Sequence, residues 1–380
     1  MHTRLCNFIR IFAVMFMLQA FTSSCSAESL DAALNEQVIR VPVKAGLWNV
    51  DLETTVFKPP GSGPFPLLVM NHGKARGNTH LQQRARYLVI SREFVKRGYA
   101  VVIPMRRGFA GSGGNYVESA CNISGNGDTQ ADDVQGILEY LVAQPWVDAN
   151  RIVIAGQSHG GLTAIAFGTR RFPGVRGLIN FAGGLRKDQG NCQWKQSLVH
   201  AFANYGAKSN LPSIWFYGEN DSYFGPELVK QMYAAYTEAG GKAALVAYGP
   251  FREDAHSMSS HRDGVQIWLP PVEKFLQEIG LPTAQTVTLP NAANVAATDF
   301  ASIADVDAVP YVKNTGKDGY RAFLEKAPPR AFAISSSGAW GWSSSSDDPG
   351  GKAIANCRKH GQQPCRLYAV DNDVVWEESP

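Results

Sequence analysis

The chain has 380 residues, of which 44% are hydrophobic and 18% charged, so it can bury a large core and does not have the composition of a disordered chain. Its formal net charge of +3 at pH 7 arises from 36 basic and 33 acidic residues. This near balance gives no support to nucleic-acid binding, which needs a strongly basic face.

The first 27 residues follow the order of a secretory signal peptide. Arg4 and Arg10 are the only charges, residues 11–21 are apolar, and small residues lead to Ala27. The apolar run is shorter than the roughly 20 residues of a membrane span. We therefore expect cleavage near Ala27, export to the periplasm of a bacterium or to the medium, and no stable membrane span afterwards. Lipid attachment at Cys25 is the less favoured alternative, because Thr22 stands where such sites usually carry a leucine-like residue.

Residues 28–285 alternate short apolar runs with segments of helical periodicity. This pattern predicts an α/β domain with a largely parallel sheet covered by helices. We expect strands at residues 66–70, 99–104, 151–155, 175–181, 212–217 and 242–248. We expect helices at residues 84–97 and 127–144. Residues 183–210 lack strand character, and we interpret them as an excursion from the sheet, such as a lid.

The composition changes after about residue 285 to Ala, Asn, Thr, Val and Asp, with Pro290 and Pro310 inside the segment and Pro282 just before it, and we interpret residues 286–319 as a linker. Residues 320–380 then form a small unit that contains Trp340 and Trp342. These two aromatic side chains either belong to the core of the unit or bind a glycan or protein of the cell envelope. A unit of this size needs a covalent staple.

The cysteines supply such a staple if the protein is exported. Four of them remain after the signal peptide, an even number, and we expect the disulfides Cys357–Cys365, across a short glycine-containing turn, and Cys121–Cys192. A metal site is the alternative interpretation. It is less favoured because the spacings contain no CxxC pair and no histidine at ligand spacing beside one, so we expect no metal and no other cofactor.

The sequence GQSHGG at residues 156–161 carries the strongest chemical signal. It follows the apolar run at 152–155 and precedes a helix-like stretch at 162–167, so Ser158 lies on an expected strand-to-helix turn. Such a turn exposes a serine nucleophile, and only glycines fit two residues before and after it. We therefore predict Ser158 as a nucleophile whose neighbour, His159, offers a backbone N–H to the developing oxyanion.

A nucleophilic serine needs a base and an acid from the ends of later strands. The strand at 212–217 leads to Asp221, which we prefer to Glu219 because Asp221 lies further out in the loop. The strand at 242–248 leads to His256, which we prefer to His261 because His261 stands where it could cap the following helix. We expect His256 to take the Ser158 proton and Asp221 to orient the imidazole.

The loop after the strand at 66–70 is expected to supply a second oxyanion donor, the backbone N–H of Lys74. His72 precedes the nucleophile in the chain and is interpreted as shaping this loop. The glycine-rich segment 106–114 suggests a phosphate-binding loop. We reject that interpretation because the segment lacks the Gly-Lys-Ser/Thr ending and no helix begins directly after it.

Four segments together resemble the dienelactone-hydrolase-like and prolyl-oligopeptidase-like branch of the α/β-hydrolases. They are VMNHG at 69–73, RRGFAGSGG at 106–114, VDANRIVIAGQSHGG at 147–161 and YGEND at 217–221. The resemblance implies the α/β-hydrolase fold and a Ser-Asp-His triad. Dienelactone hydrolases proper use a cysteine nucleophile where this chain has Ser158, so the resemblance does not extend to their substrate. The end of the chain resembles short disulfide-bearing extensions of exported bacterial proteins.

We therefore expect a secreted serine hydrolase that cleaves a small carboxylic ester or lactone. A serine exopeptidase of the prolyl-oligopeptidase type is the alternative. It is less favoured because such enzymes carry a large N-terminal propeller, whereas about ten residues separate the signal peptide from the first strand here. Trp194, Tyr223 and Phe224 are the expected lining of the substrate pocket. The sequence indicates no nucleic-acid partner and no particular oligomeric state.

Overall fold

The computed structural model describes residues 30–46, 48–187, 192–289, 297–326, 328–344, 348–361 and 363–377. The expected signal peptide at 1–27 and the alternative lipid site at Cys25 lie outside the described residues. Within the described ranges, every helix is too short or too polar to cross a membrane.

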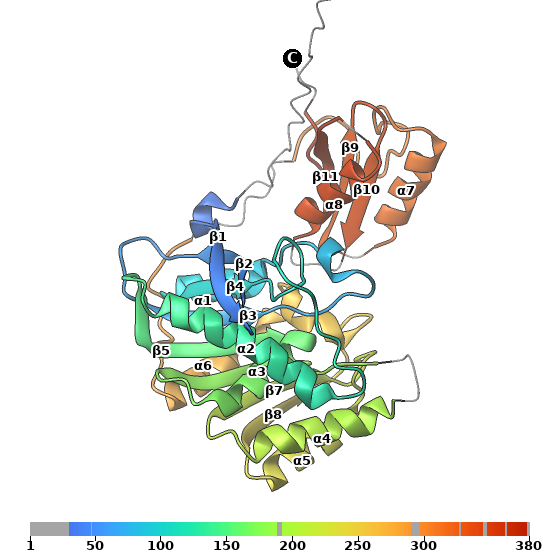
Figure 1. Ribbon diagram of the computed structural model, residues 1–380. Helices are drawn as coiled ribbons and strands as arrows, with labels where there is room; N and C mark the ends of the chain where they lie inside the picture. Colours follow the sequence, from blue (N-terminus) through green and yellow to red (C-terminus); the bar gives the residue numbers. More distant parts are fainter. Residues whose placement is uncertain are drawn as a thin grey trace, which may run out of the picture.

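An eight-stranded sheet forms the centre of the larger part of the chain (Figure 1). Its strands in chain order are β1 Gln37–Ala45, β2 Trp48–Phe57, β3 Phe65–Asn71, β4 Ala100–Pro104, β5 Val147–Gln157, β6 Val175–Phe181, β7 Pro212–Gly218 and β8 Lys242–Tyr248. Across the sheet their order is β1-β2-β4-β3-β5-β6-β7-β8. Strands β1 and β2 form an antiparallel hairpin, and β2 also pairs antiparallel with β4. The other six strands, β3 to β8, run parallel to one another. This architecture confirms the predicted mostly parallel sheet.

Helices cover both faces of this sheet, which explains why its central strands are almost continuously apolar. The helices are α1 Leu88–Lys96, α2 Ile123–Leu141, α3 His159–Phe167, α4 Trp194–Gly206, α5 Pro226–Glu238 and α6 Val265–Glu278. Along β3, Leu67 and Val69 pack in the core cluster under α2 to α5. Leu68 and Met70 face the opposite way, into the cluster that contains α1 and α6.

The segment predicted as an excursion from the sheet, residues 183–210, contains α4. Leu198, Ala201 and Phe202 of this helix are fully buried and belong to the same core cluster as α2 and α5. From residue 194 onward the segment is therefore a packed part of the α/β body. The expected helix 84–97 also differs, because α1 begins only at Leu88 and leaves residues 84–87 as an irregular segment beside the sheet.

A second, four-stranded antiparallel sheet forms a small unit at the C-terminal end, shown in orange and red in Figure 1. It contains α7 Asn314–Leu324, β9 Arg330–Ser335, β10 Trp340–Ser344, α8 Pro349–Arg358, β11 Cys365–Val370 and β12 Asp373–Val374. Tyr320 and Phe332 are fully buried at the centre of its core. Phe300, Val309 and Val312, from the segment that the sequence assigns to a linker, pack in the same core.

Two disulfides staple the described chain. Cys121–Cys192 joins the segment before α2 to the segment before α4 across 71 residues, and Cys357–Cys365 joins the end of α8 to the start of β11 across eight. A cross-link over a longer loop removes more conformational freedom from the unfolded chain. The first disulfide therefore constrains the body of the sheet, and the second supplies the staple that so small a C-terminal unit needs.

Candidate active site

Ser158 occupies the turn between β5 and α3. Its backbone has φ 56° and ψ −121°, a combination that a serine adopts only where its surroundings enforce it. The amide of Ser158 donates to Phe181 O of β6 at 2.9 Å, and the amide of Gly184 donates to Ser158 O at 3.0 Å. These bonds hold the turn at the carboxyl end of the sheet, and Ser158 lines a cleft there.

Two glycines allow this turn to close tightly. A Cβ atom on Gly156 would lie 2.0 Å from Gly160 O, and a Cβ atom on Gly160 would lie 2.0 Å from Asn71 O at the end of β3. Both distances are far below van der Waals contact, so no side chain fits at either position. The start of α3 therefore packs backbone against backbone on the loop that follows β3.

Asp221 and His256 form a hydrogen-bonded pair at the same end of the sheet. Asp221 follows β7 and is 6% exposed; its Oδ1 accepts from the amides of Tyr223 at 2.8 Å and Phe224 at 2.9 Å. Its Oδ2 lies 3.0 Å from His256 Nδ1. Because a carboxylate only accepts, Nδ1 carries the proton, and Nε2 is left as the basic nitrogen of the ring. His256 lines the cleft together with Ser158.

The loop that carries His256 is fixed by polar contacts that sequence reasoning did not identify. Asp254 Oδ1 accepts from the amide of His256 at 2.9 Å, and Asp254 Oδ2 accepts from Ser222 Oγ at 2.6 Å. Burial alone would raise the pKa of Asp254, but these hydrogen bonds hold it below its ordinary value. Gln157, next to Ser158, donates from Nε2 to His256 O at 3.0 Å. The histidine loop is thus tied to both the Asp221 loop and the Ser158 turn.

Glu219 and His261, the alternatives for the acid and the base, lie outside the described lining of the cleft. Glu219 is exposed, and its amide bonds to Tyr248 O of the neighbouring strand. His261 is 1% exposed, and its ring packs against Phe251. Burial, together with the Arg252 guanidinium, lowers the pKa of His261 to about 4. Neither residue lines the cleft that contains Ser158, among the residues described for it.

The loop after β3 runs alongside Ser158. A Cβ atom built on Gly73 would lie 3.4 Å from Ser158 Cβ, and the Gly73 amide donates to the Tyr87 hydroxyl at 3.1 Å. Lys74, the next residue, lines the cleft with Ser158. Tyr87 belongs to the irregular segment before α1 and has a positive φ of 42°. The sequence offered no signal for this contact, because no motif includes Tyr87.

A buried polar network lies behind the Ser158 turn. The fully buried Arg106 donates from Nη2 to His72 O at 2.6 Å and approaches His159 Nδ1 at 3.2 Å. His159 Nε2 lies 2.7 Å from Asn126 Oδ1, so it carries the ring proton and donates to that amide oxygen. Burial, then the Arg106 charge, holds the pKa of His72 and of His159 well below the ordinary value for histidine. Both rings are therefore neutral at pH 7.

This network makes the stability of the fold depend on pH. In the unfolded chain His159 takes up a proton near pH 6.5, whereas in the folded protein a proton on Nδ1 would face the Arg106 guanidinium. The unfolded state then binds more protons, so the free energy of unfolding falls as the pH drops below 6.5. We expect a His159→Gln variant to lose less stability between pH 7 and 5 than the wild type, by up to about 1.4 kcal/mol per pH unit in urea unfolding. Parallel pH profiles would contradict the buried neutral ring.

The cleft itself has a volume of about 710 Å³ and is lined by both parts of the chain. Of the expected pocket residues, Tyr223 lines it, with its ring 4.4 Å from that of His256. Phe224 is buried behind His256, at 5.7 Å between the ring centroids. Trp194 lies at the start of α4, with the Arg186 guanidinium over its ring, and is not among the described lining residues.

The glycine-rich segment 106–114 serves the scaffold. The amide of Gly113 donates to Asp51 O of β2, and the Arg107 amide donates to Asp133 Oδ2 of α2 at 2.8 Å. Among the described residues, no three or more His, Cys, Asp or Glu side chains are grouped so that they could hold a metal ion.

Comparisons with known proteins extend this description. The model of the X-Pro dipeptidyl-peptidase family (S15 family) matches residues 46–211, a range that contains Ser158 and ends before Asp221. Over 117 residues the chain is 29% identical to the acylamino-acid-releasing enzyme of Rattus norvegicus, covering 30% of this chain and 15% of that protein. Over 127 residues it is 30% identical to the cocaine esterase of Rhodococcus sp., covering 33% and 19%. The chain thus spans only a small part of the length of these relatives.

A solved structure gives the same picture at the level of the fold. The puromycin-hydrolyzing peptidase of Mycobacterium tuberculosis superposes with a TM-score of 0.50 at 17% identity, covering 70% of this chain and 43% of that one. The strand order and the strand-to-helix turn at Ser158 are consistent with the family match, whose range includes that turn. The chain has the α/β-hydrolase fold.

Proposed function

We propose that this enzyme hydrolyses a carboxylic ester or lactone through an acyl-enzyme on Ser158, with His256 as general base and Asp221 as its orienting acid. The observation that carries the proposal is the Asp221–His256 hydrogen bond of 3.0 Å beside a serine held at a positive φ in the same cleft. Nucleophilic catalysis by serine needs this set of groups.

In the proposed reaction Ser158 Oγ attacks the carbonyl carbon while its proton moves to His256 Nε2. The resulting oxyanion is stabilised by the backbone N–H groups of His159 and Lys74. His256 then returns the proton to the leaving alkoxide, which departs as an alcohol. A water molecule attacks the acyl-enzyme with the same help from His256, releasing the carboxylic acid and restoring the Ser158 hydroxyl. Asp221 stays ionised throughout and stabilises the imidazolium.

The charges around the cleft favour an ester over the substrate of an exopeptidase. An enzyme that releases residues from a free amino terminus must bind an ammonium group, for which a carboxylate is the usual partner. Asp348 is the one acidic residue among the described lining residues, and it is committed to Arg86 at 2.8 Å and to the amide of Gly351 at 2.9 Å. The cleft therefore offers an ammonium little compensation.

The test compares p-nitrophenyl acetate and butyrate with alanyl and prolyl p-nitroanilides, using residues 28–380 of wild type and of Ser158→Ala. We expect ester turnover by the wild type, and its loss in the variant. Anilide turnover without ester turnover would reverse the assignment in favour of the exopeptidase.

We further propose that the enzyme works outside the cytoplasm. Two disulfides within the described residues support this placement, because disulfides persist in oxidising compartments and are rare in the cytosol. Amino-terminal sequencing of protein recovered from the periplasm or medium should start near Glu28. A cytoplasmic protein that retains Met1 would contradict the proposal.

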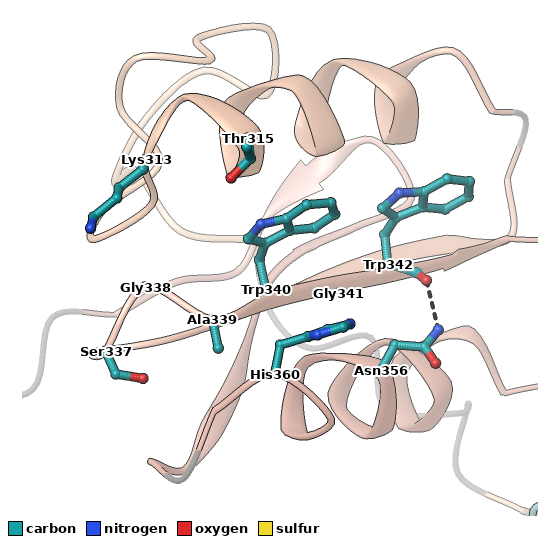
Figure 2. A pocket seen from close by; sticks show the side chains of 10 residues that line it. All are labelled: Lys313, Thr315, Ser337, Gly338, Ala339, Trp340, Gly341, Trp342, Asn356 and His360. Atoms are coloured by element: carbon teal, nitrogen blue, oxygen red, sulfur yellow. Dashed lines mark hydrogen bonds between the residues drawn. The ribbon is translucent and has the colours of Figure 1, made fainter.

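The tryptophans of the C-terminal unit favour packing over the binding of an envelope partner. Trp340, Trp342 and His360 line a hollow of about 520 Å³ beside α7 (Figure 2). The Trp340 ring stacks on Phe332 at 6.0 Å, and a Cβ atom on Gly319 of α7 would strike it at 2.2 Å. Trp340 is thus packed between the sheet and α7.

A further inference from the structure

Helix α8 of the C-terminal unit forms a wall of the cleft that contains Ser158 and His256. The residues that it and its cap contribute to the lining are Asp348, Gly351, Lys352, Ile354, Ala355 and Arg358. They are about 190 residues beyond the nucleophile in the chain. The space in front of Ser158 is therefore bounded by both parts of the protein.

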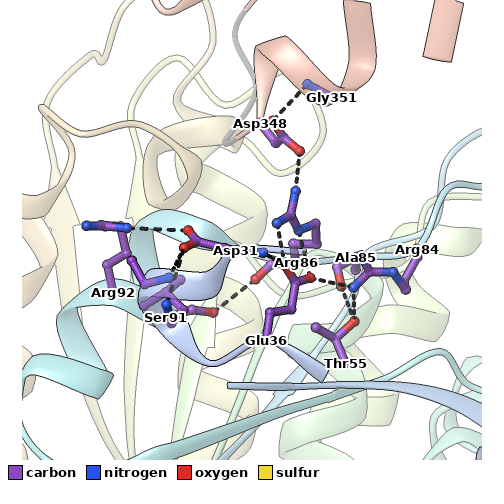
Figure 3. A network of polar contacts seen from close by, with 12 residues as sticks. Asp31, Glu36, Thr55, Arg84, Ala85, Arg86, Ser91, Arg92, Asp348 and Gly351 are labelled. Atoms are coloured by element: carbon purple, nitrogen blue, oxygen red, sulfur yellow. Dashed lines mark hydrogen bonds and ion pairs between the residues drawn. The ribbon is translucent and has the colours of Figure 1, made fainter. Parts of the chain in front are cut away.

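A buried ion-pair network fixes this wall in place (Figure 3). Glu36, whose side chain is fully buried, accepts from Arg84 at 2.8 Å and from both Nε and Nη2 of Arg86, at 2.9 and 2.5 Å. Burial alone would raise the pKa of Glu36, but the Arg86 contacts and the Asp31 amide hold it below its ordinary value, so the carboxylate is charged. Arg86 is consequently held in one orientation.

The remaining Nη1 of Arg86 points at the C-terminal unit and pairs with Asp348 Oδ2 at 2.8 Å. The other oxygen of Asp348 accepts from the Gly351 amide at 2.9 Å, so Asp348 is also the N-cap of α8. The Asp348 carboxylate thus caps the N-terminus of α8 and also binds this helix to Arg86 of the α/β domain. Lys352 lies one turn into this docked helix, which fixes its backbone at the cleft.

The cationic side chains that line the cleft differ in whether a carboxylate neutralises them. Arg84 and Arg86 form salt bridges with the carboxylates of Glu36 and Asp348. Lys74 and Lys352 are not offset, because across the described part of the chain neither ammonium has a carboxylate at ion-pair distance; Lys74 Nζ lies over the Tyr116 ring at 5.4 Å. Both lysines are half-buried at the cleft, where screening by water is reduced. The space in front of Ser158 is therefore electropositive.

We infer that the substrate is an ester that carries a carboxylate, and that Lys352 of α8, with Lys74, recognises this group. The C-terminal unit is then a specificity-determining part of the active site. This inference rests on the proposed ester hydrolysis at Ser158 and names its substrate class. A carboxylate between two lysines forms charge-assisted hydrogen bonds, which are stronger than neutral ones and are realised only by an anionic substrate.

The experiment compares the mono-p-nitrophenyl esters of glutaric, adipic and suberic acid with the neutral p-nitrophenyl esters of equal carbon number. We expect the kcat/KM ratio of anionic to neutral ester to exceed one for at least one chain length, and to fall as salt is added, because ions screen the lysines. Lys352→Gln should lower this ratio about tenfold, and Lys352→Glu should lower it further. Lys359→Gln, at the C-cap of the same helix and outside the described lining, is the matched control and should leave the ratio unchanged.

The possible results distinguish failure of the proposed ester hydrolysis from failure of the proposed role of α8. Absence of any Ser158-dependent ester turnover would remove the proposed function itself. Turnover of neutral esters with no preference for the anionic series, or a preference that survives Lys352→Gln, would overturn the role of α8. The salt dependence of the wild-type ratio needs no variant, so a folding defect in a variant leaves the inference testable.

Discussion

Replacing His256 with alanine should lower kcat/KM for p-nitrophenyl butyrate roughly 10⁴- to 10⁶-fold, the range found when the base of a serine triad is removed. The physical reason is that a serine hydroxyl is a weak nucleophile at neutral pH and needs a base, the role we propose for His256, which lines the same cleft. Its Nδ1 donates to Asp221 at 3.0 Å, which leaves Nε2 as the nitrogen that can accept a proton. Steady-state kinetics at pH 8 measure the effect.

His261→Asn is the matched control for this prediction. His261 lies on the same loop five residues further on, but it is buried against Phe251 and its Nε2 contacts Ser257 Oγ at 3.2 Å. We expect this variant to keep its rate within about tenfold while losing stability, since it disturbs only packing and one hydrogen bond. If instead His261→Asn abolished turnover and His256→Ala retained it, the assignment of the base would be wrong.

Replacing Gly160 with alanine should lower the free energy of unfolding by more than about 3 kcal/mol, or prevent folding. The new Cβ would lie 2.0 Å from Asn71 O, 2.4 Å from Asn71 C and 2.8 Å from His72 O. All three are backbone atoms at the end of β3, so relief requires α3 and the central sheet to move apart. Urea unfolding followed by tryptophan fluorescence measures the loss.

Gly249→Ala provides the comparison, because a Cβ atom there meets nothing within 4 Å and the backbone φ is not positive. We expect a change below about 1 kcal/mol for this variant. Equal losses for the two variants would mean that the Ser158 turn does not depend on the close approach of α3 to β3.

The sheet and the turn at Ser158 could be predicted because their signals are local. The strands at 175–181 and 242–248 have the predicted bounds, since each is an apolar run delimited by polar or turn residues. The strand-to-helix turn at Ser158 is predictable on the same basis, from glycines at fixed spacing between a strand and a helix. Turn chemistry of this kind is contained in a few consecutive residues, so no knowledge of the tertiary fold is needed to identify it.

The surroundings of the cleft could not be predicted, because they depend on contacts between distant segments. Arg86 and Asp348 are 262 residues apart, and nothing in either local sequence indicates that they pair. The segment with Tyr87 follows helical periodicity, which predicts a helix, whereas tertiary contacts hold it in an irregular conformation at the cleft. Val309 and Val312 stand among polar residues and prolines, so their place in the C-terminal core left no periodic signal.

The central claim, that the Ser158 hydroxyl is the nucleophile, is tested most directly by labelling the folded protein with a fluorophosphonate. We predict a single adduct, located by peptide mass spectrometry on the peptide that contains GQSHGG, and no adduct in Ser158→Ala. An adduct on a different residue, or undiminished labelling of the variant, would contradict the account.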